Sequence, residues 1–135
     1  MNYKEEKKQI LREAGVAQHK YWTTLIEQYS KFPSLATSIS KLSTTEGEKL
    51  WAKAKKDMET KEYKEMQKEM QEADRKFYQC KNAYEQLSRS LVKEGVLKRG
   101  LNRDFYGEMI SVMDKKLASE MMTAKHKYQQ RRDNE

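Results

Sequence analysis

The sequence is poor in the residues that interrupt helices. It contains one proline and five glycines in 135 residues, whereas sheets and tight turns depend on such residues at regular intervals. Hydrophobic and charged residues each make up 36% of the chain, against about 45–50% and about a quarter in an average globular protein. This composition is typical of long helices with a narrow apolar stripe and a wide solvated face. The sequence therefore predicts an all-α protein, and its length predicts a single domain over residues 1–135.

Cysteine and long apolar runs are also scarce. Cys80 is the one cysteine, so no internal disulfide can form and no oxidising compartment is needed. No apolar run approaches the roughly 20 residues that cross a bilayer. The first six residues, MNYKEE, contain no apolar stretch of the kind found in a signal peptide. We therefore expect a cytoplasmic protein that does not bind membranes.

The first predicted helix covers residues 3–32. Pro33 ends it, because proline has no N–H and disfavours helical geometry at the residue before it. A short helix over residues 34–42, capped by Ser34, is predicted to follow. The alternative is an ordered loop, anchored by the three apolar residues that recur there at helical spacing: Leu35, Ile39 and Leu42.

The longest predicted helix covers residues 45–94 and would contain about 49 residues. Thr45 and Glu48 match the capping-box pattern, in which each side chain satisfies a free backbone N–H at a helix start. Gly95 stands where a left-handed residue commonly ends a helix.

The apolar seam of this helix contains one irregular step. From Tyr63 to Leu91 apolar residues alternate by three and four positions, as in a coiled coil. The step from Met58 to Tyr63 is five, so the seam shifts there. One continuous helix is the preferred interpretation, since no proline or glycine lies nearby. The alternative is a break near residue 60 that produces a compact four-helix bundle.

The third predicted helix covers residues 102–130. Asn102 would cap it, and Leu101 and Tyr106 are spaced as a hydrophobic staple around that cap. The polar tail after residue 130 is expected to fray. Three long helices predict an elongated antiparallel bundle or coiled coil, with the second helix at its centre and the flanking helices overlapping only around residues 63–75.

No group of residues has the spacing of a catalytic or metal site. His19 and His126 lie far apart, and neither has a cysteine or carboxylate at a recognised metal-ligand spacing. Cys80 has no histidine three or four positions away to activate it. The carboxylates of residues 57–74 alternate with lysines, as on an ordinary solvated helix face. We therefore expect no enzyme, no metal or other cofactor and no small-molecule substrate.

The first functional hypothesis is a helical protein-binding module of the adaptor, chaperone, scaffold or inhibitor type. The chain has eight tyrosines and eight methionines, and both are common on recognition surfaces. An apolar helix face would dock on another protein or on a second copy of the chain, forming a homo-oligomer. The residues expected to bind lie around the irregular step: Trp51, Met58, Tyr63, Met66 and Met70.

The alternative hypothesis is a nucleic-acid-binding accessory protein that contacts phosphates without reading sequence. The net charge of +7 favours polyanions or acidic protein surfaces. Basic residues gather between the second and third helices and again near the C-terminus, and Tyr106 is close enough to the first group to stack on a base. An antiparallel arrangement would separate these two groups. The residues expected to bind are Lys98, Arg99, Arg103, Arg131 and Arg132.

Overall fold

The computed structural model describes residues 2–35 and 42–133, and these residues form helices and no strand. The prediction of an all-α helical bundle is confirmed. The elements, in chain order, are α1 (Tyr3–Lys31), the 3-10 turn η1 (Pro33–Leu35), α2 (Thr44–Met58), α3 (Lys61–Lys93), α4 (Phe105–Val112) and α5 (Lys115–Asp133).

The short helix predicted over residues 34–42 is described only at its ends. Ser34 and Leu35 belong to η1, so the chain makes a 3-10 turn directly after Pro33. Leu42 is half-buried, whereas Ile39 and the rest of residues 36–41 lie outside the described residues.

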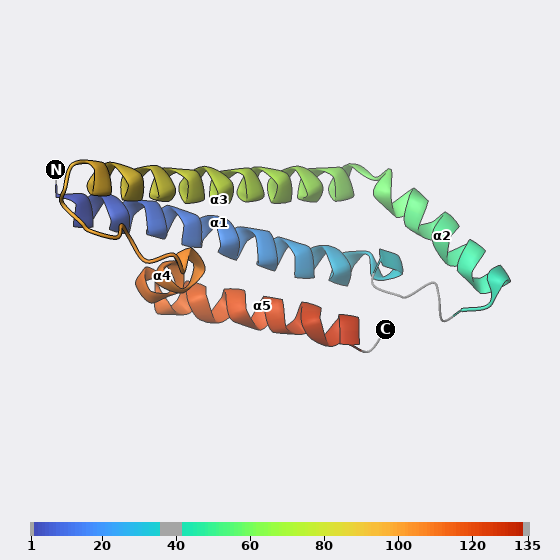
Figure 1. The fold of residues 1–135 in the computed structure, drawn as a ribbon. Helices are drawn as coiled ribbons and strands as arrows, with labels where there is room; N and C mark the ends of the chain where they lie inside the picture. Colours follow the sequence, from blue (N-terminus) through green and yellow to red (C-terminus); the bar gives the residue numbers. More distant parts are fainter. Residues whose placement is uncertain (1, 36–41, 134–135) are drawn as a thin grey trace.

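The central helix of the bundle is α1. It lies between α3 on one side and α4 with α5 on the other (Figure 1). α3 runs antiparallel to α1, whereas α5 runs in the same direction as α1. This corrects the predicted arrangement, in which the second long helix was central. In α1 the neighbours Ala14 and Gly15 are both buried, as are Ala17 and Gln18. Successive residues point about 100° apart on a helix, so α1 buries a face wide enough for two partners.

α2 and α3 are separate helices, which corrects the predicted continuous helix over residues 45–94. Thr60 makes the break without proline or glycine. Its Oγ1 accepts from the N–H of Tyr63 at 3.2 Å and donates to the carbonyl oxygen of Asp57 at 2.7 Å. A threonine bonded in this way satisfies a free N–H at a helix start. The break coincides with the five-residue step in the apolar seam, as the alternative interpretation expected.

α2 extends away from the body formed by α1, α3, α4 and α5 (Figure 1), and we call it the α2 arm. Its principal contacts are with η1 and the start of the neighbouring helix α3. The Ser34 hydroxyl donates to Asp57 Oδ2 at 2.7 Å and so joins η1 to the end of the arm. The compact four-helix bundle is therefore not formed either, because the fourth helix projects beyond the other three.

Both ends of the segment predicted as one long helix are capped. The cap at its start lies two residues earlier than predicted. The capping box at its start is formed by Ser43 and Glu46, with N···O distances of 3.2 and 3.3 Å, rather than by Thr45 and Glu48. Both pairs match the same four-residue pattern, so the sequence offers two registers. The other end agrees with the prediction, because Gly95 adopts φ +75° after α3.

The predicted helix over residues 102–130 is also divided, which is a further correction. Asp104 caps α4 in place of Asn102, and its Oδ1 accepts from the N–H of Gly107 at 3.0 Å. Met113 is extended, with ψ 150°. Asp114 then starts α5, since its Oδ1 accepts from the N–H of Lys116 at 2.9 Å. The apolar stripe crosses this break without a change of phase, so its spacing alone gives no sign of two helices.

Gly15 explains how α1 accommodates the break between α4 and α5. A Cβ on Gly15 would lie 2.5 Å from Cγ of Met113. Such a separation is well inside the van der Waals contact distance of about 3.5–4.0 Å. The missing side chain therefore lets Met113 pack directly against the backbone of α1.

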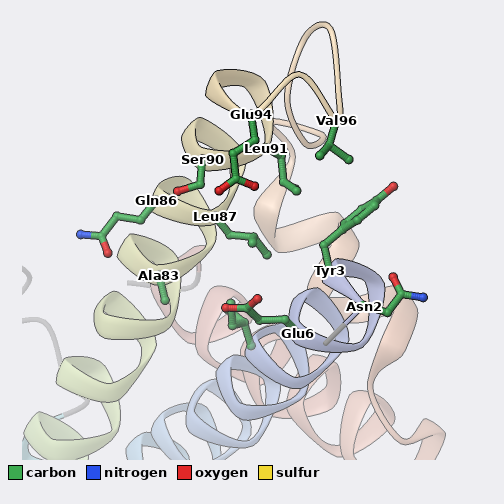
Figure 2. A pocket seen from close by; sticks show the side chains of 11 residues that line it. Asn2, Tyr3, Glu6, Ala83, Gln86, Leu87, Ser90, Leu91, Glu94 and Val96 are labelled. Atoms are coloured by element: carbon green, nitrogen blue, oxygen red, sulfur yellow. The ribbon is translucent and has the colours of Figure 1, made fainter.

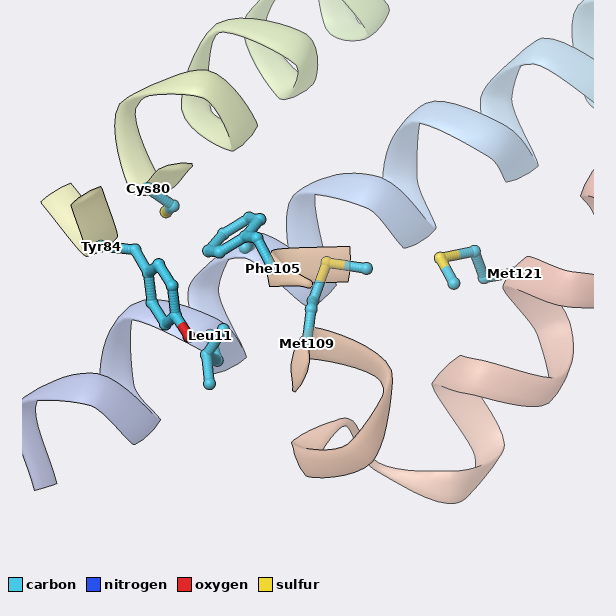
Figure 3. Close-up of a cluster of buried hydrophobic side chains, with 7 residues drawn as sticks. Leu11, Cys80, Tyr84, Phe105, Met109 and Met121 are labelled. Atoms are coloured by element: carbon cyan, nitrogen blue, oxygen red, sulfur yellow. The ribbon is translucent and has the colours of Figure 1, made fainter. Parts of the chain in front are cut away.

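The hydrophobic core lies where α1, α3, α4 and α5 meet (Figure 3). Leu11, Met109 and Met121 are essentially inaccessible to solvent. Tyr84 is also buried, and its hydroxyl donates to the carbonyl oxygen of Asn102 at 2.7 Å. The seven residues of the cluster are Leu11, Ala14, Cys80, Tyr84, Phe105, Met109 and Met121.

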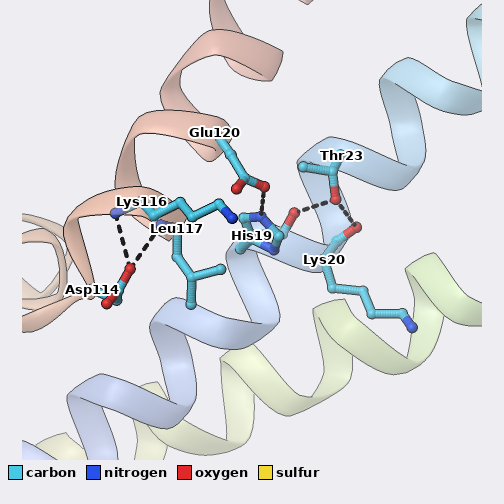
Figure 4. Close-up of polar contacts among 7 residues, drawn as sticks. All are labelled: His19, Lys20, Thr23, Asp114, Lys116, Leu117 and Glu120. Atoms are coloured by element: carbon cyan, nitrogen blue, oxygen red, sulfur yellow. Dashed lines mark hydrogen bonds and ion pairs between the residues drawn. The ribbon is translucent and has the colours of Figure 1, made fainter.

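A polar contact joins α1 to α5, on the side of α1 that faces away from α3. His19 Nε2 lies 3.1 Å from Glu120 Oε2 (Figure 4). One turn further along α1, the hydroxyl of Thr23 donates back to the carbonyl oxygen of His19 at 2.8 Å. His19 therefore joins two helices of the body and is engaged in structure.

Candidate functional site

A basic hollow lies between the C-terminal half of α3 and the segment 99–105. Its volume is about 760 Å³. Five of its lining residues are cations and one, Glu85, is a carboxylate. All five cations are exposed to solvent. They are Lys81, Arg89, Lys93, Arg99 and Arg103.

The α3 wall of the basic hollow follows from a four-residue repeat. Lys81, Glu85, Arg89 and Lys93 succeed one another at steps of four, and residues four apart are neighbours on a helix surface. At 1.5 Å per residue this row is about 18 Å long. The basic hollow is therefore elongated along α3.

Two glycines bring the second wall back against α3. After Gly95 turns the chain, the N–H of Val96 donates to the carbonyl oxygen of Leu91 at 2.9 Å, which completes a Schellman cap. Gly100 has φ +79°, and a Cβ there would lie 2.4 Å from Ser88 Oγ. That same Oγ accepts from the N–H of Leu101 at 2.8 Å. The loop is thus bound to α3 at Ser88, which itself lines the basic hollow.

The floor of the basic hollow is aromatic and buried. Tyr84 and Phe105 both line it, both are buried, and their ring centroids are 5.0 Å apart. Burial raises the pKa of the Tyr84 hydroxyl, and the nearby carboxylates of Glu108 and Asp104 raise it further. Tyr84 therefore stays neutral at physiological pH and keeps donating to Asn102. These contacts fix the loop that carries Arg103.

The cations of the basic hollow have no ion pair with a described carboxylate, unlike some of the cations elsewhere in the body. Among the described residues, no carboxylate oxygen lies within 4.0 Å of a side-chain nitrogen of the five. By contrast, Lys31 contacts Glu62 at 2.6 Å and Lys76 contacts Glu13 at 3.7 Å. Charges of one sign around a hollow reinforce one another and attract counterions. The basic hollow is thus suited to an extended anion.

The structure brings together only part of the residue set predicted for nucleic-acid binding. Arg99 and Arg103 line the basic hollow, and Lys98 is exposed in the same loop. Arg131 lies near the far end of α5, with its guanidinium 5.9 Å from the ring centroid of Tyr29. Arg132 belongs to α5, but its side chain lies outside the described part of the chain. As the antiparallel argument expected, the two basic groups lie apart (Figure 1).

Sequence reasoning missed Lys81 and Arg89, and its expectation for an aromatic residue beside the site stays a prediction. The four-residue repeat from Lys81 to Lys93 was visible in the sequence, but nothing local showed that the loop returns to that side of α3. Tyr106 was expected to stack on a base. Its ring is half-buried instead, with Lys125 Nζ 4.6 Å from the ring centroid.

The residues predicted for protein binding are also divided by the fold. Met66 and Met70 are each only 7% exposed. Tyr63 is half-buried, and its ring packs edge-on against Phe32 with centroids 5.7 Å apart. Met58 is half-buried and Trp51, on the α2 arm, is 48% exposed. The protein-binding hypothesis stays a prediction, and the accessible part of its surface is Trp51 with parts of Met58 and Tyr63.

A second hollow, of about 670 Å³, lies between the start of α1 and the end of α3 (Figure 2). Its charged lining residues are Glu6 and Glu94. Tyr3, Leu87 and Val96 supply apolar surface. It therefore has the opposite charge to the basic hollow and is not suited to phosphates.

Within residues 2–35 and 42–133, no three histidine, cysteine or acidic side chains are grouped so that they could bind a metal ion. Cys80 is buried, and burial raises the pKa of its thiol, against a smaller lowering by Lys76. A thiol in that state is a poor nucleophile at neutral pH. In the same residues, no helix has the length and apolar character needed to cross a membrane.

Comparison with protein-family models, with curated proteins and with solved structures gives no match for this chain.

Proposed function

We propose that the protein is a non-catalytic nucleic-acid-binding protein that holds a sugar–phosphate backbone in the basic hollow without reading sequence. The observation that carries the proposal is the group of five exposed cations around one elongated hollow, with no ion pair to a described carboxylate. Most contacts to a nucleic-acid backbone come from arginine, lysine and small polar side chains. Each of these residue types lines the basic hollow.

The two walls of the basic hollow would bind phosphates in different ways. Arg99 and Arg103, on the loop, can each present a planar guanidinium with two parallel N–H donors to one phosphate. Lys81 and Lys93 would act as point charges along α3. Because the loop is bound to α3 through Ser88, little order has to be gained on binding. Affinity would then come mainly from release of counterions from the nucleic acid.

The test is fluorescence anisotropy with a labelled oligonucleotide of about 16 nucleotides, a length at the upper end of common site sizes, at low and at physiological salt. The variant is Arg99→Glu with Arg103→Glu. We expect it to weaken binding about tenfold or more. It should also reduce the slope of log affinity against log salt by about 1.4–1.8, since about 0.7–0.9 is lost for each phosphate contact.

The matched control is Lys53→Glu with Lys56→Glu. Both lysines are exposed on the α2 arm, so the control changes the net charge equally but leaves the basic hollow intact. It should lower the affinity much less. Equal losses for the two variants would overturn the proposal, because the charge would then act generically. Failure of the unaltered protein to bind any oligonucleotide would also overturn it and direct the search to an acidic protein partner.

A further inference from the structure

An exposed tyrosine continues the aromatic floor of the basic hollow. Tyr84 and Phe105 form that floor, Phe105 contacts Phe77 with ring centroids 5.6 Å apart, and Phe77 contacts Tyr78 at 5.4 Å. The contacts therefore form an unbroken series from the buried floor to the surface of α3. Tyr78 ends the series, and 53% of its surface is exposed.

Tyr78 lies on the same side of α3 as the cations of the basic hollow. It precedes Lys81 by three positions and Glu85 by seven, and both spacings place side chains on one helix face. Tyr78 lies within one helical turn of Lys81. An anion that lies along Lys81 and Arg89 would therefore reach the tyrosine. Aromatic side chains next to a basic groove are the usual platform for unpaired bases.

Two other exposed or half-buried aromatic residues near cations are less suited to this role. A cation already lies over Tyr106, where Lys125 Nζ is 4.6 Å from the ring centroid. Trp51 has Lys55 Nζ at 5.6 Å from its ring centroid, and it lies on the α2 arm, away from the basic hollow. No described cation is placed over the ring of Tyr78.

We infer that the ligand of the basic hollow is single-stranded nucleic acid, with one base stacked on Tyr78 and the adjoining phosphates along Lys81, Arg89 and the loop arginines. This inference rests on the proposed function and adds the form of the nucleic acid. In a duplex the base faces are stacked on one another and only edges are accessible in the grooves. In a single strand a base face can lie on the ring while its backbone continues into the basic hollow.

The experiment compares the full chain with Tyr78→Ala and Tyr78→Phe, using a labelled single-stranded oligonucleotide and its duplex at physiological salt. Stacking on an aromatic side chain is worth about 1–3 kcal/mol per base, which corresponds to about 5- to 140-fold in affinity. We expect Tyr78→Ala to lose that factor for the single strand and to bind the duplex unchanged. Tyr78→Phe keeps a ring and should retain most of the affinity.

Trp51→Ala is the matched control, because it removes a similarly exposed aromatic residue next to a lysine. It should leave both affinities unchanged. The inference is overturned if Tyr78→Ala has no effect, or if it weakens single strand and duplex equally. If the reversal of Arg99 and Arg103 still weakens binding in that case, the proposed function stands without the inference. If the unaltered protein binds neither oligonucleotide, both are overturned. Circular dichroism of each variant tests whether the helices persist.

Discussion

The two parts of the molecule that present lysines and an exposed aromatic residue to solvent differ in how their charges are arranged. On the α2 arm, the exposed lysines lie on the convex surface of a single helix: Lys49, Lys53 and Lys56. Around the basic hollow, five cations on two chain segments face one space. Opposing walls add their fields, whereas charges spread over a convex surface are screened by water and salt. The comparison shows that composition alone does not identify a binding site, because the fold decides which charges act together.

The same two regions differ in packing, and the largest expected effect tests this difference. Leu11 is 1% exposed in the core beneath the basic hollow. Leu11→Ala should lower the free energy of unfolding by about 2–5 kcal/mol, since it removes buried methyl groups and leaves a cavity. Trp51→Ala on the α2 arm should cost at most about 1 kcal/mol, although it removes a larger side chain.

Urea denaturation of both variants, followed by circular dichroism, measures these costs. If Trp51→Ala were as damaging as Leu11→Ala, the α2 arm would contribute to the stability of the whole chain, and its separation from the body would be wrong. The same result would make Trp51→Ala unsuitable as a control for binding.

The next largest effect concerns the two glycines that turn the loop. Both have positive φ, so alanine at either position should cost about 1–2 kcal/mol of backbone strain. Nothing lies within 4 Å of a Cβ at Gly95, whereas one at Gly100 would lie 2.4 Å from Ser88 Oγ. Gly100→Ala should therefore cost about 1–3 kcal/mol more than Gly95→Ala, as overpacking does.

The loop also carries Arg99 and Arg103. The same glycine variants should therefore change both the free energy of unfolding and the proposed binding. Gly100→Ala should weaken oligonucleotide binding, because it pushes the loop away from α3, and Gly95→Ala should weaken it less. Denaturation and anisotropy on the same two variants measure both effects. Equal costs for the two variants would show that the loop is not bound closely to α3 at Ser88.

The parts of the fold that sequence reasoning predicted correctly depend on residues that act locally. Pro33 ends α1 and Gly95 ends α3, because each has a backbone property that no neighbour can override. The break at Asp114 was missed, and the break at Thr60 was only the alternative interpretation, because side-chain caps produce both of them. Threonine and aspartate occur throughout the charged surface of this chain, and whether one of them caps a helix depends on the packing on either side.

The candidate site was predictable to a similar extent. Arg99 and Arg103 are close in sequence, so their grouping needs no tertiary information. Lys81 and Arg89 join them only because the chain returns against α3 after Gly100, and Tyr78 joins through ring contacts with Phe77 and Phe105. The missing information is the long-range packing between the loop and α3.

The smallest expected effect is a pH dependence of the free energy of unfolding. It arises from Tyr84 in the floor of the basic hollow and has no counterpart on the α2 arm. Burial raises the pKa of Tyr84, with Glu108 and Asp104 adding to it. The unfolded chain then loses this proton at lower pH than the folded chain. The stability that Tyr84 contributes is fully present below the ordinary tyrosine pKa near 10, and it is lost as pH rises through the higher folded value.

Tyr84→Phe keeps the buried ring but removes the hydroxyl that donates to Asn102 at 2.7 Å. At neutral pH it should cost about 0.5–1.5 kcal/mol, the net contribution of one hydrogen bond. Between neutral pH and pH values above 10, the unaltered protein should lose more stability than the variant. Urea midpoints across that range measure the difference. Because Tyr21 and Cys80, whose pKa values are also raised, are present in both proteins, parallel losses would mean that the loop does not depend on the Tyr84 hydroxyl.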